Sequence, residues 1–124
     1  MSTIRVLENL PEPHPTRPRP GVRRLLQADG GNLICFHFLP GQSLPDHRAA
    51  HPITVQCLRG TLVFTCEDEE ITMEPGVVLH LPAYLIHRVD CPADADPAEQ
   101  HVLLLTMLTG EDATPPRARR LRHP

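Results

Sequence analysis

The sequence of 124 residues contains no lysine and no tryptophan, and it has only one tyrosine and three phenylalanines. Leu, Val, Ile and Met must therefore fill most of the core. The net charge of −3 gives no general attraction to a polyanion, so we expect no nucleic-acid partner. No stretch approaches the ~20 apolar residues of a membrane helix, and the first ten residues lack the apolar segment of a secretion signal. We therefore expect a cytoplasmic protein without a membrane partner.

The four cysteines are widely spaced and include no Cys-x-x-Cys pair. In a cytoplasmic protein, such cysteines are most simply free thiols that behave as small hydrophobic residues. Cys57 is a weak candidate for a catalytic role because it lies in a predicted strand that follows two histidines in the sequence.

Proline is abundant, with 15 residues, but the prolines gather near the ends of the chain and at strand boundaries. Residues 11–20 cannot form a helix or a central strand, because so many of their backbone N–H donors are missing. We predict an extended N-terminal arm over residues 1–21, a single β-rich domain over residues 22–110 and a flexible basic tail over residues 111–124.

Short apolar or alternating segments bounded by Gly and Pro run through the central region and predict strands. The acidic run at residues 67–70 predicts a solvated hairpin loop, because like charges repel one another in a buried setting. Residues 102–108 could form a helix on apolarity alone, but their place after seven or eight strands favours a closing strand. The predicted class is therefore an all-β sandwich or barrel. The expected strands lie at residues 22–27, 33–39, 53–58, 61–65, 71–73, 77–81, 87–89 and 101–108. His101 opens the last of these strands, and we expect its side chain to be exposed.

Two motifs in this region place histidines among turn glycines and prolines, and they resemble the two motifs of the cupin superfamily, in particular its small single-domain bacterial members. The resemblance covers roughly residues 22–108 and implies a jelly-roll barrel, the double-stranded β-helix of that family. Only fifteen residues separate the two motifs, as in compact cupins. The matching positions are Gly41, His47 and Gly60 in the first motif and Gly76, Pro82 and His87 in the second.

The departures from the family pattern concern the chemistry of the site. The second histidine of the first motif falls on Ala49, and the motif glutamate falls on Ile53. In the second motif, Tyr84 replaces a glycine and Cys91 replaces an asparagine. Of the four metal ligands that the resemblance implies, only two histidines remain, and two imidazoles alone bind a metal weakly.

His51 could restore a third ligand if its loop crosses the mouth of the barrel. His47, His51 and His87 would then form a three-histidine site for one divalent transition metal: Fe, Mn, Ni or Zn. The resemblance would in that case imply oxygenase- or isomerase-type chemistry on a small molecule. No motif carboxylate is left as a base, so Tyr84 or Cys57 would be the weak candidates for proton transfer.

A second interpretation is a cupin without metal that binds a small ligand, or acts as a sensor, without catalysis. Apolar residues at two former ligand positions suit a binding pocket. A third interpretation is a module that serves to dimerise. A homodimer is expected under all three interpretations, because exposed edge strands and a proline-rich arm favour pairing between copies.

Overall fold

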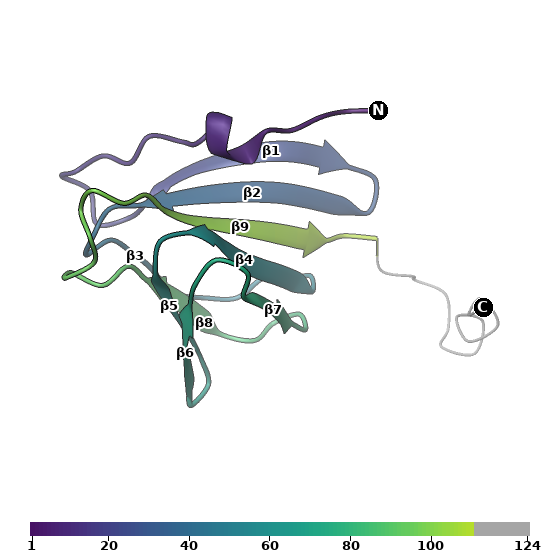
Figure 1. Cartoon of the computed structure of the whole chain (residues 1–124). Helices are drawn as coiled ribbons and strands as arrows, with labels where there is room; N and C mark the ends of the chain where they lie inside the picture. The colour runs from purple at the N-terminus through teal and green to yellow at the C-terminus, as the bar shows by residue number, and fades with distance from the viewer. Residues whose placement is uncertain (111–124) are drawn as a thin grey trace.

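The computed structural model describes residues 1–110, and the predicted basic tail at residues 111–124 lies outside the described part. One short 3₁₀ turn precedes a series of β-strands (Figure 1). The elements are η1 (Val6–Glu8), β1 (Gly21–Ala28), β2 (Gly31–Phe38), β3 (Ser43–His47), β4 (Ile53–Arg59), β5 (Leu62–Cys66), β6 (Glu69–Met73), β7 (Val78–Leu81), β8 (His87–Asp90) and β9 (His101–Leu108).

The strands form two antiparallel sheets that pack face to face. The larger sheet has the order β1-β2-β9-β4-β7, and the smaller has the order β3-β8-β5-β6. Figure 1 shows the smaller sheet below the larger one, with the β5–β6 hairpin projecting from it. The prediction of an all-β jelly roll is confirmed, and residues 101–108 form the central strand of the larger sheet.

Period-two alternation directs one face of each strand into the space between the sheets. In β4, Ile53, Val55 and Cys57 are each 1% exposed, whereas the residues between them are half-buried. In β5, Leu62 and Phe64 face inward in the same way. The aliphatic core expected from the composition therefore lies between the two sheets.

Strand β3 is the one strand that the sequence did not predict. It contains Pro45 and Asp46, two residues that are depleted in strands. Its position at the edge of the smaller sheet tolerates a proline, because an outward N–H needs no partner strand. The pairing with β8 is also irregular between Leu44 and His47. Because β3 carries His47, the sequence alone did not show how this histidine is positioned.

The N-terminal arm lies against the barrel of its own chain. Gln42 is 4% exposed, and its side-chain amide donates hydrogen bonds to the carbonyls of His14 and Arg17, each at 3.0 Å. Its side-chain oxygen accepts a hydrogen bond from the backbone N–H of Leu39 at 2.8 Å. One buried glutamine therefore joins the arm to the turn between β2 and β3, with all its polar atoms paired.

His101 is only 1% exposed, although its position at the start of a strand had suggested an exposed side chain. Its Nδ1 accepts a hydrogen bond from the backbone N–H of Thr61, and its Nε2 donates to the carbonyl of Asp96. Gly60 has a φ of +76°, and a Cβ at this position would overlap the His101 ring. The glycine is therefore required by both its backbone conformation and the close approach of the imidazole.

Within residues 1–110, no helix is long and apolar enough to cross a membrane.

Candidate functional site

The fold brings together two of the three predicted histidine ligands. His47 on β3 and His87 on β8 are direct partners across the two strands. Their imidazole centroids lie 4.2 Å apart, with an angle of 61° between the ring planes. His87 lies 40 positions after His47 in the sequence, so it is the pairing of β3 with β8 that creates this histidine pair.

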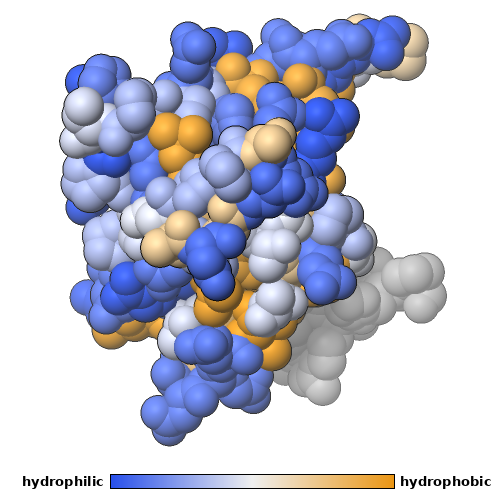
Figure 2. Space-filling model, turned by 60° about the vertical axis from the view of Figure 1, so that its left-hand side comes forward, coloured by the Kyte–Doolittle hydropathy of each residue, from blue (hydrophilic) through white to orange (hydrophobic). Residues whose placement is uncertain are grey.

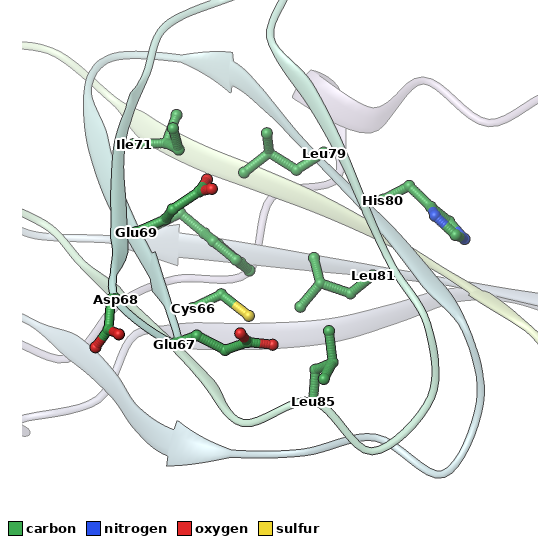
Figure 3. Close-up of a pocket in the computed structure, with 10 residues that line it drawn as sticks. Cys66, Glu67, Asp68, Glu69, Ile71, Leu79, His80, Leu81 and Leu85 are labelled. Atoms are coloured by element: carbon green, nitrogen blue, oxygen red, sulfur yellow. The ribbon is translucent and has the colours of Figure 1, made fainter.

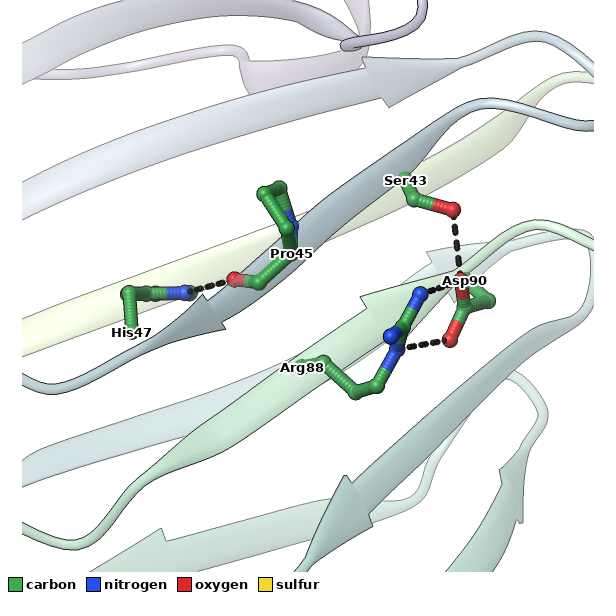
Figure 4. A network of polar contacts seen from close by, with 5 residues as sticks. All are labelled: Ser43, Pro45, His47, Arg88 and Asp90. Carbon is green, nitrogen blue, oxygen red and sulfur yellow. Dashed lines mark hydrogen bonds and ion pairs between the residues drawn. The ribbon is translucent and has the colours of Figure 1, made fainter.

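Backbone carbonyls fix which nitrogen of each ring carries the proton. His47 Nδ1 lies 2.8 Å from the carbonyl oxygen of Pro45 (Figure 4), and His87 Nδ1 lies 3.0 Å from that of Leu85. A carbonyl oxygen only accepts hydrogen bonds, so Nδ1 is the protonated nitrogen in each ring. Each neutral imidazole therefore keeps its lone pair on Nε2, where it can accept a hydrogen bond or bind a metal.

The two histidines differ in their environment. His87 is 3% exposed, and its ring stacks on Phe64 with centroids 5.4 Å apart. Burial lowers the pKa of His87, its hydrogen bond to the Leu85 carbonyl acts in the opposite direction, and the neighbouring His47 lowers it further. His47 is exposed. The pair thus joins a neutral buried imidazole to one that water can reach.

Apolar side chains occupy the positions at which the resemblance to cupins implies metal ligands. Ile53 is 1% exposed and belongs to the core cluster, and Ala49 packs against the same cluster. His51 is half-buried and lies in the segment between β3 and β4. Among residues 1–110, no group of three or more His, Cys, Asp or Glu side chains is arranged to hold a metal ion. Metal binding by His47, His51 and His87 together therefore stays a prediction.

Tyr84 adopts a backbone conformation that normally favours glycine. Its φ is +69°, and its N–H donates a 2.8 Å hydrogen bond to the carbonyl of Ala49. This bond ties the turn before β8 to the segment after β3. The side chain is 61% exposed beside Ile86, which is 55% exposed. Tyr84 therefore occupies the glycine position of the second motif at the cost of backbone strain.

Cys57, the other weak catalytic candidate, is a buried thiol. Its Sγ donates to the carbonyl of Arg59 at 3.2 Å. Burial raises its pKa to about 11; the Arg59 hydrogen bond opposes this, and the charges of Glu99 and Glu74 add to it. The thiol is therefore protonated at neutral pH and is a poor nucleophile. All four cysteines are free, as predicted: Cys35, Cys57, Cys66 and Cys91.

A cavity of about 400 Å³ opens between the β5–β6 hairpin and β7, and we call it the barrel cavity (Figure 3). Figure 2 shows hydrophobic surface in the lower half of the molecule, above the hydrophilic lobe that the hairpin forms. The lining of the barrel cavity is an apolar wall with polar residues at the rim. The apolar residues are Phe64, Ile71, Leu79, Leu81 and Leu85, and the others are Cys66, Glu67, Asp68, Glu69 and His80.

A second hollow of about 580 Å³, which we call the outer cavity, lies beside the first on the other side of the turn before β8. His87 and Tyr84 both line it, together with Ile86. Leu85 and Glu67 line both cavities. The Leu85 carbonyl also receives the His87 hydrogen bond, so the histidine pair lies next to both hollows.

The sequence did not predict that the acidic run at residues 67–70 would lie beside a cavity. The turn residues are only Glu67 and Asp68, because β6 already begins at Glu69. The run is exposed, as expected, but three of its four members also border the barrel cavity. The position of the acidic run in the sequence was the signal that could have indicated this, because the run directly joins two strands whose alternating apolar residues face the core.

Comparison with solved structures supports the same fold. A protein from Thermus thermophilus superposes with a TM-score of 0.69 at 22% identity, covering 85% of this chain and 96% of that one. A cupin superfamily protein from Desulfitobacterium hafniense gives a TM-score of 0.59 at 24% identity, covering 81% of this chain and 97% of that one. A protein of unknown function from Streptococcus pyogenes gives 0.62 at 21% identity, covering 77% and 79%. At these identities, the likeness shows the fold alone.

No curated protein matches the chain. The sequence does match the family described as Cupin domain over residues 35–104, which is more than half of its length. The match includes both histidine motifs and most of the core strands. This chain therefore belongs to the cupin family.

Proposed function

We propose that this cupin binds a small molecule in the barrel cavity and that the histidine pair lies at the edge of this binding site. The observation that carries the proposal is the cavity itself, with its five apolar lining residues and a volume of about 400 Å³. Ligand sites in proteins are typically concave, mostly apolar and supplied with a few polar groups.

His87, which lines the neighbouring outer cavity, would supply a defined polar group at the edge of this site. Its lowered pKa favours the neutral ring, and the Leu85 carbonyl fixes the proton on Nδ1. The Nε2 lone pair is then free of that proton and can accept a hydrogen bond from a ligand hydroxyl or amine. Phe64 stacks on His87 and also lines the barrel cavity. A ligand that contacts Phe64 in the cavity would therefore change the surroundings of the His87 ring.

The residues do not fit a divalent metal held as a resident cofactor. Catalytic metal sites commonly use three protein ligands. Here the described part of the chain brings together two imidazoles, while Ala49 and Ile53 present only carbon atoms at the positions where the family has ligands. The proposal therefore includes no step on a metal and favours ligand binding over metal-dependent catalysis.

Two tryptophan variants on neighbouring residues of β7 test the proposal. Leu79 faces the barrel cavity, whereas Val78 is 56% exposed and does not line it. A thermal-shift screen of small molecules should find compounds that stabilise the wild type and the Val78→Trp variant but not the Leu79→Trp variant. Compounds that stabilise all three proteins equally would place the binding site elsewhere.

The metal content of the purified protein tests separately whether His47, His51 and His87 bind a metal. Protein purified without a histidine tag should contain far less than one equivalent of Fe, Mn, Ni or Zn. Stoichiometric metal that disappears in the His87→Ala and His51→Ala variants would instead establish the three-histidine site. If only His87→Ala removed the metal, His51 would be excluded as a ligand.

We also propose that the protein is a homodimer. The edge strand β1 has no described partner on its outer side, and Val22 on this strand is 60% exposed. Unpaired edges favour association between copies. Light scattering coupled to size-exclusion chromatography should give a mass of about 28 kDa, twice the 13.8 kDa of one chain. A mass of one chain at micromolar concentration would contradict this.

A further inference from the structure

The barrel cavity has a strongly asymmetric charge at its rim. Glu67, Asp68 and Glu69 line it, and none of the described lining residues is an arginine. The chain contains no lysine, so His80 is the only basic side chain among the described lining residues. Within residues 1–110, the ion pairs join Arg5 to Glu8 and Arg88 to Asp90, so no described side chain forms an ion pair with a rim carboxylate.

Two of these carboxylates extend toward the cavity. In Figure 3, Glu67 and Glu69 point into the space in front of β7, whereas Asp68 points away from it. Their charges also act on the Cys66 thiol, which lies between them in the same view. Burial is the largest cause that raises the pKa of Cys66, and the charges of Glu67 and then Glu69 raise it further. The negative potential of the two carboxylates thus reaches Cys66, another lining residue.

The opposite wall of the cavity is apolar. Leu79, Leu81 and Leu85 face the hairpin from β7 and from the turn before β8. A ligand that fits this site must therefore place an apolar body against the leucines and a group that tolerates two carboxylates at the rim. An anionic group would be repelled there, and a neutral group would gain no charge pairing.

We propose that the ligand of the barrel cavity is an amphipathic organic cation, with an ammonium or guanidinium group between Glu67 and Glu69 and an apolar body against the leucines. This inference rests on the proposed function and adds to it the chemical class of the ligand. The acidic run is not itself the site: Glu70 belongs to the same run but does not line the cavity.

Three probes of nearly equal size and different charge test the inference: phenethylamine, 2-phenylethanol and phenylacetate. Binding is measured by NMR titration of the full chain at neutral pH, as shifts of the leucine methyl signals. The amine should bind about tenfold more tightly than the alcohol, and the carboxylate should bind most weakly. Raising the salt concentration from about 0.02 M to about 0.5 M should weaken binding of the amine alone, because salt screens exposed charges.

Matched variants assign the effect to the two carboxylates. The double variant Glu67→Gln/Glu69→Gln keeps the side-chain shapes and removes two charges from the rim. Its affinities for the amine and the alcohol should become equal. The variant Glu70→Gln removes a charge from the same run without touching the cavity, and it should retain most of the preference for the amine. All affected side chains are exposed, so melting temperatures should confirm that each variant folds.

The outcomes separate this inference from the proposed function. Equal binding of the three probes to the wild type, or a preference that survives in the double variant, overturns the cationic class. If the alcohol binds and Leu79→Trp abolishes its binding, the cavity is still a ligand site without charge selectivity. If none of the probes binds at about 10 mM, the inference is overturned, and the compound screen described above decides the proposed function.

Discussion

Replacing Tyr84 by glycine is expected to stabilise the protein. Tyr84 has a φ of +69°, a conformation that costs an L-residue about 1–2 kcal/mol. Its side chain is 61% exposed, so its removal sacrifices little packing. Glycine adds about 0.4–1 kcal/mol of unfolded-chain entropy, which offsets part of the gain. The free energy of unfolding should therefore rise by about 0.5–1 kcal/mol, and the melting temperature by about 3 °C.

The variant Tyr84→Ala is the control, because it removes the same aromatic ring and keeps a Cβ in the strained conformation. Urea denaturation of the three proteins under identical conditions measures the differences. The glycine variant should be the most stable, and the alanine variant should be no more stable than the wild type. If the glycine variant were as unstable as the alanine variant, the tyrosine ring would contribute packing that its exposure does not indicate. Backbone strain at Tyr84 would then not explain the stabilities.

Three further predictions concern the fold and the histidine pair. Gly60→Ala should lower the free energy of unfolding by about 3 kcal/mol or more, because its Cβ would overlap His101. Gly41→Ala has open space around its Cβ and should cost only the backbone strain of about 1–2 kcal/mol. Urea denaturation of the two variants measures the difference. The free energy of unfolding should decrease as the pH falls below about 6.5, because the pKa of His87 is lower in the folded chain and the unfolded chain therefore binds a proton more readily. The variant His87→Gln should flatten this pH dependence between about pH 5 and 7. An unchanged slope would contradict the assignment to His87. Gln42→Ala removes three hydrogen bonds, so it should lower the free energy of unfolding by about 2–4 kcal/mol and speed hydrogen exchange in the N-terminal arm. Unaltered exchange would show that other contacts hold the arm.

The fold could be predicted because its signals are local and repeated. Ile53, Val55 and Cys57 alternate with more polar residues, and this period-two pattern defines the inner face of β4 without any knowledge of its partners. The glycines with positive φ at residues 41, 60 and 76 mark turns in the same way, since only glycine adopts such angles readily. These signals depend on neighbouring residues and so survive in a single sequence.

The site depends on contacts between distant residues, and the sequence showed less of it. His47 meets His87 only because β3 pairs with β8, and β3 was hidden by Pro45 and Asp46. His101 was expected to be exposed because the pattern around it does not reveal that Gly60 and Thr61 close over its ring. Glu67 and Glu69 were read as solvated charges, and their exposure agrees, but only the folded hairpin places them at a cavity.

Ligand binding by the Leu79→Trp variant, compared with binding by Val78→Trp, tests directly the claim that the barrel cavity holds a small molecule. A compound that raises the melting temperature of the wild type should raise that of Val78→Trp equally and leave that of Leu79→Trp unchanged. Equal stabilisation of both variants would contradict the claim and move the functional site away from the barrel cavity.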